Sequence, residues 1–206
     1  AGIVAFGQKI PKDKKQLIAS VENHKEELIS ISDQIWANAE IAFQETESSK
    51  LLADYAEANG FTVERGVADI PTAFIATYGE GKPVISVLGE FDALPGISQK
   101  AQPTKEPLEA GAAGHGCGHN LFGTASLGAA IAVKEMIEAG EIKGTVKFIG
   151  TPAEEKFFGK LWMLEAGVWD DVDVNVSWHP SADTKSDVQS SLAMVDFIVE
   201  FNGQAA

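Results

Sequence analysis

Apolar residues in the N-terminal part of the chain recur with the period of an α-helix. Over Lys14–Ala39 they fall at steps of three, four and seven, which predicts one amphipathic helix. His24 occupies the missing step of this apolar stripe, so we expect a packed or partly buried histidine rather than a ligand. A second helix is predicted at about Thr46–Ala58, because Asn59-Gly60 forms a C-cap signal directly after it.

Short extended segments follow, and the sequence predicts strands at Phe61–Glu64, Thr72–Tyr78 and Pro83–Leu88. The third is mostly apolar and branched, as in a strand that is covered on both faces. Residues 79–82 (Gly-Glu-Gly-Lys) predict a hairpin turn and not a phosphate-binding loop, because no helix follows them. Residues 97–114 form a long predicted loop, and loops of this length in compact domains are often functional.

The next part of the chain alternates between helix and strand patterns. After the strand that ends at Leu88, we expect helix, strand, helix and strand at Leu121–Ala139, Thr145–Ile149, Phe158–Ala166 and Val172–Trp178. This order implies parallel crossovers and therefore an α/β fold. Residues 191–201 alternate well enough to be one more strand, after a polar loop at 181–190 that suits a domain boundary.

Composition and charge restrict the expected partners. The 206 residues are 45% hydrophobic and 22% charged, as in a soluble globular domain, and no apolar run is long enough to span a membrane. A net charge of −14 repels phosphates and anionic lipids, so neither nucleic acid nor a membrane is an expected partner. The single cysteine, Cys117, excludes an intrachain disulfide and fits a reducing cytoplasm, where we expect the protein.

Side chains with metal-binding or catalytic chemistry follow three of the predicted strands. Glu90-Phe91-Asp92, Glu154-Glu155 and His179 each come within a few residues of a strand end. In open α/β sheets, ligands bind beyond the carboxyl ends of the strands, so we expect the three sets to converge at one edge. One set alone would be compatible with a solvated turn. In the adjacent glutamates, one carboxylate can bind metal while the other transfers a proton.

A glycine-rich segment, Gly114-His115-Gly116-Cys117-Gly118-His119-Asn120, precedes the long predicted helix. Two imidazoles and a thiol within five residues are typical of metal sites, and the glycines permit tight turns. The alternatives are a glycine-rich helix entry with incidental histidines, or a Cys117 nucleophile activated by His115 or His119. A nucleophile would not need the two glutamates or His179, so the sequence favours a metal site.

With these residues the sequence resembles the zinc peptidase family that includes carboxypeptidase G, aminoacylase and hippuricase. The similarity indicates the amidohydrolase subgroup of hippuricase and aminobenzoyl-glutamate hydrolase. The Cys-Gly-His and Pro-Ala-Glu-Glu motifs, in this order, are specific. The matching motifs span nearly the whole chain and are Asn38-Ala39-Glu40 with Gln44-Glu45, Gly89–Pro95, His115–Asn120, Gly150–Glu155 and Ser177–Pro180.

The resemblance implies a site for two divalent metal ions. Cys117 would bridge the two ions, with His119, Glu155 and His179 as further ligands. Zinc is the first expectation, and manganese, cobalt and nickel are alternatives because mixed thiolate, imidazole and carboxylate ligands suit several metals.

The same resemblance assigns roles to residues beside the ligands. Glu154 would be the general base that takes a proton from the attacking water and returns it to the leaving amine. Asp92 would support and orient the site, whereas His115 matches a family position without an assigned role. Asn120 stands where the subgroup usually has Asp, and the aminobenzoyl-glutamate branch tolerates Asn there.

The C-terminal end departs from the family pattern. The family has another histidine ligand near its C-terminus, whereas no histidine follows His179 here. Residues 195–206 resemble the first strand of the family's inserted dimerisation domain. The resemblance therefore implies a mixed, mainly parallel sheet flanked by helices in a catalytic domain at 1–189, and the start of a truncated α+β dimerisation and lid domain at 190–206.

These observations predict a metal-dependent amidohydrolase or peptidase. It would use metal-activated water to cleave the amide (C–N) bond of N-acyl amino acids, aminobenzoyl-glutamate-like compounds or short peptides. The expected partners are that small-molecule substrate and, in the intact protein, a second copy in a homodimer. The alternatives are a non-catalytic metal-binding or scaffold fragment, because the last family ligand is absent, and a cysteine-nucleophile hydrolase that chelators would not inhibit.

Overall fold

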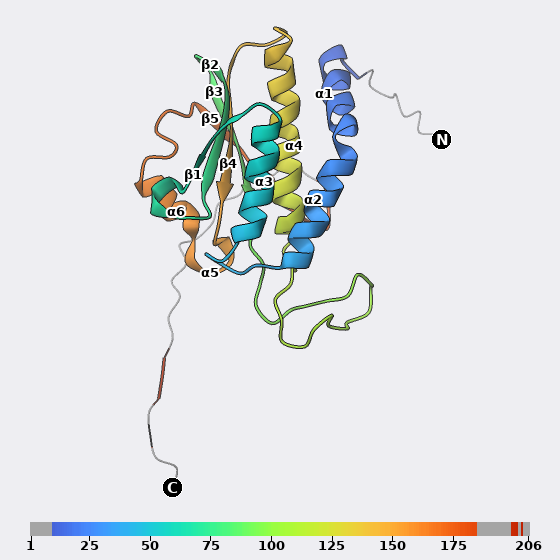
Figure 1. Ribbon diagram of the computed structural model, residues 1–206, viewed down its shortest axis with the longest axis vertical. Helices are drawn as coiled ribbons and strands as arrows, with labels where there is room; N and C mark the ends of the chain where they lie inside the picture. The colour runs from blue at the N-terminus through green and yellow to red at the C-terminus, as the bar shows by residue number, and fades with distance from the viewer. Residues whose placement is uncertain (1–9, 185–198, 202, 204–206) are drawn as a thin grey trace, which may run out of the picture.

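The structure is a computed structural model that describes residues 10–184, 199–201 and 203. A sheet with helices on both faces forms its centre (Figure 1). β3 is parallel to both β4 and β5, while β2 is antiparallel to β4 and to β1. This pattern confirms the predicted mixed α/β sheet, with two parallel and two antiparallel pairings among the described strands. Within the described residues its strands lie in the order Thr62–Arg65 (β1), Phe74–Glu80 (β2), Gly144–Thr151 (β4), Val84–Glu90 (β3) and Val174–Val176 (β5).

The helices divide between the two faces of the sheet (Figure 1). One side carries Lys12–Asn23 (α1), Lys25–Asn38 (α2), Thr46–Ala58 (α3) and His119–Glu138 (α4). The other side carries Gly159–Glu165 (α6) and the short 3-10 helix Val67–Asp69 (η1), and Glu154–Phe157 (α5) follows β4. None of the described helices combines the length and apolar character that a membrane crossing needs.

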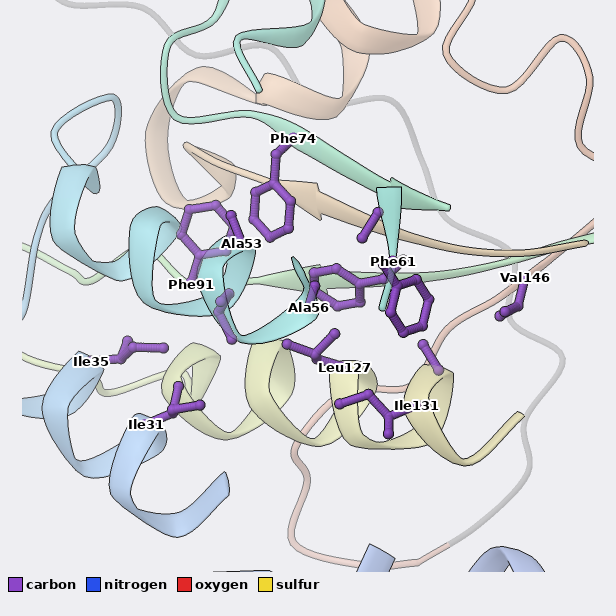
Figure 2. Close-up of a cluster of buried hydrophobic side chains, with 14 residues drawn as sticks. Ile31, Ile35, Ala53, Ala56, Phe61, Phe74, Phe91, Leu127, Ile131 and Val146 are labelled. Atoms are coloured by element: carbon purple, nitrogen blue, oxygen red, sulfur yellow. The ribbon is translucent and has the colours of Figure 1, made fainter. Parts of the chain in front are cut away.

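A large apolar core holds α2, α3 and α4 against β2 and β4 (Figure 2). Ile35, Leu52, Phe74, Leu127 and Phe148 in this core are fully buried. Burial of one such side chain contributes roughly 1.5–3 kcal/mol, so the core fixes the helices relative to the sheet. A smaller cluster on the opposite face joins α6 and η1 to the sheet through Val67, Ile70, Ala73, Ile75, Ile149, Met163 and Val168.

The first predicted helix is wrong in one respect, because the structure divides it at His24 into α1 and α2. His24 departs from helical geometry (φ −95°, ψ 1°). Its Nδ1 lies 2.8 Å from the Tyr55 hydroxyl and its Nε2 lies 3.0 Å from Glu135 Oε1, which confirms a packed, partly buried histidine. These partners come from α3 and α4, so local periodicity could not reveal the break. The second predicted helix coincides with α3.

The predicted hairpin at residues 79–82 is also wrong. The chain turns there, but β4 lies between β2 and β3, so these two strands do not pair with each other. β4 follows β3 through the crossover that contains α4 and takes the place between them. The order of strands depends on contacts between distant segments, which a local turn signal does not contain.

The last strand of the described sheet differs from the expectation in length. β5 is shorter than predicted, and its Val174 and Val176 side chains are each 50% exposed. It pairs with β3 at the edge of the described sheet. The predicted helix at Phe158–Ala166 is observed as α6, which Phe158 separates from α5 with a left-handed conformation (φ 53°). The strand predicted at 191–201 lies mostly outside the described residues.

Two glycines allow α4 to lie very close to β3. A Cβ atom added at Gly123 of α4 would lie 2.6 Å from the Glu90 carbonyl oxygen. One added at Gly89 of β3 would lie 2.9 Å from the Gly123 Cα atom. Any larger residue at either position would therefore push the helix away from the strand. This contact sets the distance between the end of β3 and His119, the first residue of α4.

We predict that Gly123→Ala destabilises the intact protein by about 1–3 kcal/mol, because overpacking against backbone atoms cannot relax easily. The apparent melting temperature should fall, although Ala is the better helix former. Gly128→Ala is the matched control in the same helix, since its added Cβ would meet the end of the flexible Leu28 side chain, at 2.8 Å. Equal melting temperatures of the two variants would contradict the importance of the close approach.

Candidate metal centre

Residues from three strand ends and one helix start meet at the carboxyl edge of the sheet, where β4 leads into α5 (Figure 1). Asp92 follows β3, and Glu154 and Glu155 open α5. His119 is the first residue of α4, and His179 follows β5. The convergence predicted from the strand ends is therefore observed.

His119 is fully buried and held by Asp92. Its Nδ1 lies 2.9 Å from Asp92 Oδ1. The other carboxylate oxygen, Oδ2, accepts a hydrogen bond of 2.8 Å from the backbone N–H of Glu155. Asp92 thus connects the start of α4 to the start of α5. His119 Nε2 has no hydrogen-bond partner among the described residues, as expected for a ring nitrogen kept for an ion.

Cys117 and His179 form a second pair of donors. Cys117 Sγ lies 3.4 Å from His179 Nε2, and His179 Nδ1 lies 2.9 Å from the carbonyl oxygen of Pro180. An Nδ1–H group that donates to this carbonyl leaves Nε2 without hydrogen, as a metal-ligating imidazole requires. The rings of His119 and His179 pack edge to face, with centroids 5.6 Å apart.

The two adjacent glutamates differ in their exposure. Glu154 Oε2 lies 4.0 Å from His119 Nε2, and the Glu154 side chain is 33% exposed. Glu155 Oε1 lies 3.8 Å from His119 Nδ1, and the Glu155 side chain is only 13% exposed. Glu155 Oε1 has no hydrogen-bond partner among the described residues. Burial raises the pKa of Glu155, so this carboxylate gains from a nearby cation.

The donors fit a divalent cation. One atom each from Cys117, His119 and His179 lie within 4.8 Å of one another, and so do one each from Glu90, His119 and Glu154. Buried polar atoms normally have partners, and His119, whose Nε2 has none among the described residues, belongs to both groups. Thiolate and imidazole donors suit zinc, while carboxylates admit harder metals.

Two residues of the glycine-rich segment have structural contacts outside this group of donors. His115 Nε2 donates to the carbonyl oxygen of Ile35 at 3.0 Å, and burial lowers the pKa of His115 to about 4. Asn120 Nδ2 donates to the Ser32 hydroxyl at 3.1 Å. Both residues therefore fasten the start of α4 to α2.

Glu45 supports the site from outside, a role that the sequence did not reveal. It is fully buried, and its Oε1 accepts a hydrogen bond of 2.8 Å from the backbone N–H of Ala153. Its Oε2 accepts a hydrogen bond of 3.1 Å from the Thr72 hydroxyl. Glu45 thereby fixes the turn that presents Glu154.

Glu90 is a site residue to which the sequence assigned no role. Its Oε2 lies 2.8 Å from His119 Nε2, and its Oε1 accepts a hydrogen bond from the Lys160 ammonium group. The available signal was its spacing from Asp92, because residues two apart in an extended segment project to the same side. Lys160 belongs to α6, and nothing in the local sequence indicates this pairing.

The acidic surroundings change the protonation of the donors. Burial by itself lowers the pKa of His119, but the Asp92 and Glu90 carboxylates together outweigh burial and raise it to about 10. Burial, with the added charge of Glu155, raises the pKa of Cys117 to about 11. Without an ion, both groups therefore keep their protons at neutral pH.

Comparison with known proteins gives this arrangement a context. The sequence profile of peptidase family M20/M25/M40 matches residues 87–197. The chain is 47% identical over 190 residues to a subunit of the p-aminobenzoyl-glutamate hydrolase of Escherichia coli (strain K12), a match that covers 91% of this chain and 39% of that protein. It is 28% identical over 205 residues to Xaa-Arg dipeptidase of Mus musculus, over 94% of this chain and 44% of that protein.

A solved structure has the same architecture. A Bacillus subtilis protein described as a dinuclear metal binding peptidase from the M20 family superposes with a TM-score of 0.67 at 31% identity. The match covers 80% of this chain and 44% of that one. The chain thus spans less than half the length of each of these relatives.

We predict that metal loading of the intact protein near pH 7 releases about two protons, one each from His119 and Cys117. A group with a raised pKa in the fold keeps its proton until the pH rises through that pKa. An ion competes with this proton, so apparent metal affinity should increase as the pH rises from neutral toward about 10. Calorimetric titration in buffers of different ionisation enthalpy measures the released protons.

Asp92→Asn is the companion variant for this titration. It removes a carboxylate that raises the pKa of His119, so fewer protons should be released. Binding heats that do not depend on the buffer in the wild-type protein would contradict the predicted protonation of the donors.

Proposed function

The chain belongs to peptidase family M20/M25/M40, and on that premise we propose that the intact protein is a binuclear metal-dependent amidohydrolase. It would hydrolyse the C–N amide bond of N-acyl amino acids, aminobenzoyl-glutamate-like compounds or short peptides. The names of two relatives, a p-aminobenzoyl-glutamate hydrolase and an Xaa-Arg dipeptidase, support substrates that contain an amino acid.

The observation that carries this proposal is the close group of Cys117, His119 and His179. Two segments, residues 117–119 and the residues after β5, bring one donor atom from each residue within 4.8 Å of the others. The Nδ1 atom of each imidazole has an oxygen partner, which leaves Nε2 for an ion, as is usual for metal-ligating histidines. Glu155 would add a carboxylate ligand, with Cys117 as the bridge between two ions.

Divalent ions bound there would polarise the amide carbonyl and make water a stronger nucleophile near neutral pH. Zinc suits this thiolate and imidazole set best, with manganese, cobalt and nickel as alternatives.

Glu154 would act as the general base. Its carboxylate is partly exposed and lies 4.0 Å from His119 Nε2, so it is close to the donors and accessible to substrate. It would take the proton of the attacking water and pass it to the leaving amine nitrogen. Asp92 would act as a positioning residue, because it holds the His119 ring and the Glu155 backbone at the same time.

A cysteine nucleophile has less support from the site. The pKa of Cys117 is raised to about 11, so a metal-free thiol would stay protonated, whereas a nucleophile needs the thiolate. A metal ion removes this obstacle, because it binds the thiolate and displaces the proton.

The proposal extends to location and assembly. We propose a cytoplasmic homodimer in which residues 1–189 form the metal-binding catalytic domain and residues 190–206 begin the dimerisation domain. The Escherichia coli relative is named as one subunit of its hydrolase. A complex with a different partner chain is therefore a second proposed form of assembly.

Glu154→Gln is expected to lower the turnover of an N-acyl amino acid by roughly 10²–10⁴-fold, because the amide cannot accept the proton. Metal content per chain should not change, since Glu154 is not a ligand in this proposal. The measurements are kcat and elemental analysis of the intact protein. Glu165→Gln is the matched control, because Glu165 is an exposed glutamate at the end of α6. This variant should retain both the wild-type kcat and the wild-type metal content. Near-normal turnover in the Glu154 variant would assign the base to another group.

Cys117→Ser is expected to reduce the metal content of the intact protein from about two ions per chain to less than one after dialysis. A serine hydroxyl keeps its proton and is a much weaker ligand than a thiolate. If the variant kept about two ions per chain, only the bridging role of Cys117 would be contradicted. A folded wild-type protein without metal would contradict the hydrolase proposal and favour a scaffold.

A further inference from the structure

The last residue of β3 carries a buried carboxylate with one oxygen that lacks a hydrogen bond. Glu90 is 5% exposed, and its Oε1 accepts a hydrogen bond from the Lys160 ammonium group. Its Oε2 lies only 2.8 Å from His119 Nε2, yet neither atom has a hydrogen-bond partner of good geometry among the described residues. A buried carboxylate oxygen without a partner is costly, so this contact requires an explanation.

The tautomer of His119 makes the contact more informative. Nδ1 lies 2.9 Å from Asp92 Oδ1, so this nitrogen carries the hydrogen in the neutral ring and Nε2 is an acceptor. Two acceptor atoms at 2.8 Å repel each other unless they share a cation. A proton can meet this need in the metal-free protein, and a metal ion can meet it in the loaded one.

We propose that Glu90 is a further ligand of the metal centre, with Oε2 as its donor atom, while its Oε1 pairs with Lys160. The inference rests on the proposed function, because it requires a divalent ion at His119. It adds a carboxylate to the four ligands proposed above. Glu90, His119 and Glu154 each offer an atom within 4.8 Å of the other two, so an oxygen-rich set shares His119 with the Cys117 set.

The charge around His119 supports a cation at this position. Glu90, Asp92, Glu154 and Glu155 all place an oxygen within 4.0 Å of a ring nitrogen of His119. Within the described part of the chain, Lys160 is the only lysine or arginine that forms an ion pair with any of them. One ammonium group cannot balance four carboxylates, and divalent ions would supply the missing positive charge.

The test is metal affinity of the intact protein, measured by competition with a chromophoric chelator for Zn²⁺ and for Mn²⁺. Glu90→Gln should lower the affinity by at least about tenfold, and more for Mn²⁺, which prefers oxygen donors. Asp173→Asn is the matched control, because Asp173 pairs with Lys82 near the opposite end of β3, at 2.6 Å. The Asp173→Asn variant also removes a carboxylate–lysine ion pair, and it should keep wild-type metal affinity.

Lys160→Met separates a ligand from a purely structural ion pair. If Glu90 is a ligand, this variant keeps the donor and loses a competing positive charge, so affinity should stay equal or rise. Wild-type affinity in Glu90→Gln, or an equal loss of affinity in both variants, would overturn the proposal. Circular dichroism shows whether Glu90→Gln is folded. If it is not, the Lys160→Met variant is the test, and a loss of metal affinity in that variant overturns the proposal. A wild-type protein without metal would instead refute the proposed function.

Discussion

The contact between the buried His119 ring and the Asp92 carboxylate determines the geometry of the whole site. One oxygen of Asp92 reaches the imidazole and the other accepts from the Glu155 backbone, so a single side chain fixes two helix starts relative to β3. A buried carboxylate is tolerated when both of its oxygens have partners. The contact in turn requires α4 to lie against β3, which the absence of a side chain at Gly123 permits.

This arrangement concentrates negative charge in a partly dry environment. Four carboxylates surround one imidazole, and burial opposes the ionised form of Glu155. A cation lowers the free energy of such a site by attraction to the carboxylates and by providing a partner for the bare ring nitrogen. Metal binding and folding stability are therefore expected to be linked, since an unfolded chain does not assemble the donors.

The supporting residues show how a motif can combine chemistry and architecture. Glu45, His115 and Asn120 all lie in segments that resemble the family, yet each is hydrogen-bonded to the backbone or to a neighbouring helix. Glu45 orients the turn before Glu154, and the other two hold the start of α4 against α2. Sequence alone could mark these residues but could not separate a ligand from a support, because that distinction depends on where each side chain points.

The sequence by itself determined the α/β class, the approximate positions of most helices and strands, and the convergence of Asp92, Glu154, Glu155 and His179 at one sheet edge. These features follow from local periodicity and from the rule that parallel strands end on one side. Tertiary structure alone decided the break at His24, the place of β4 between β2 and β3, and the pairing of Glu90 with Lys160. Each of these depends on contacts between segments far apart in the chain, and local patterns carry no information about such contacts.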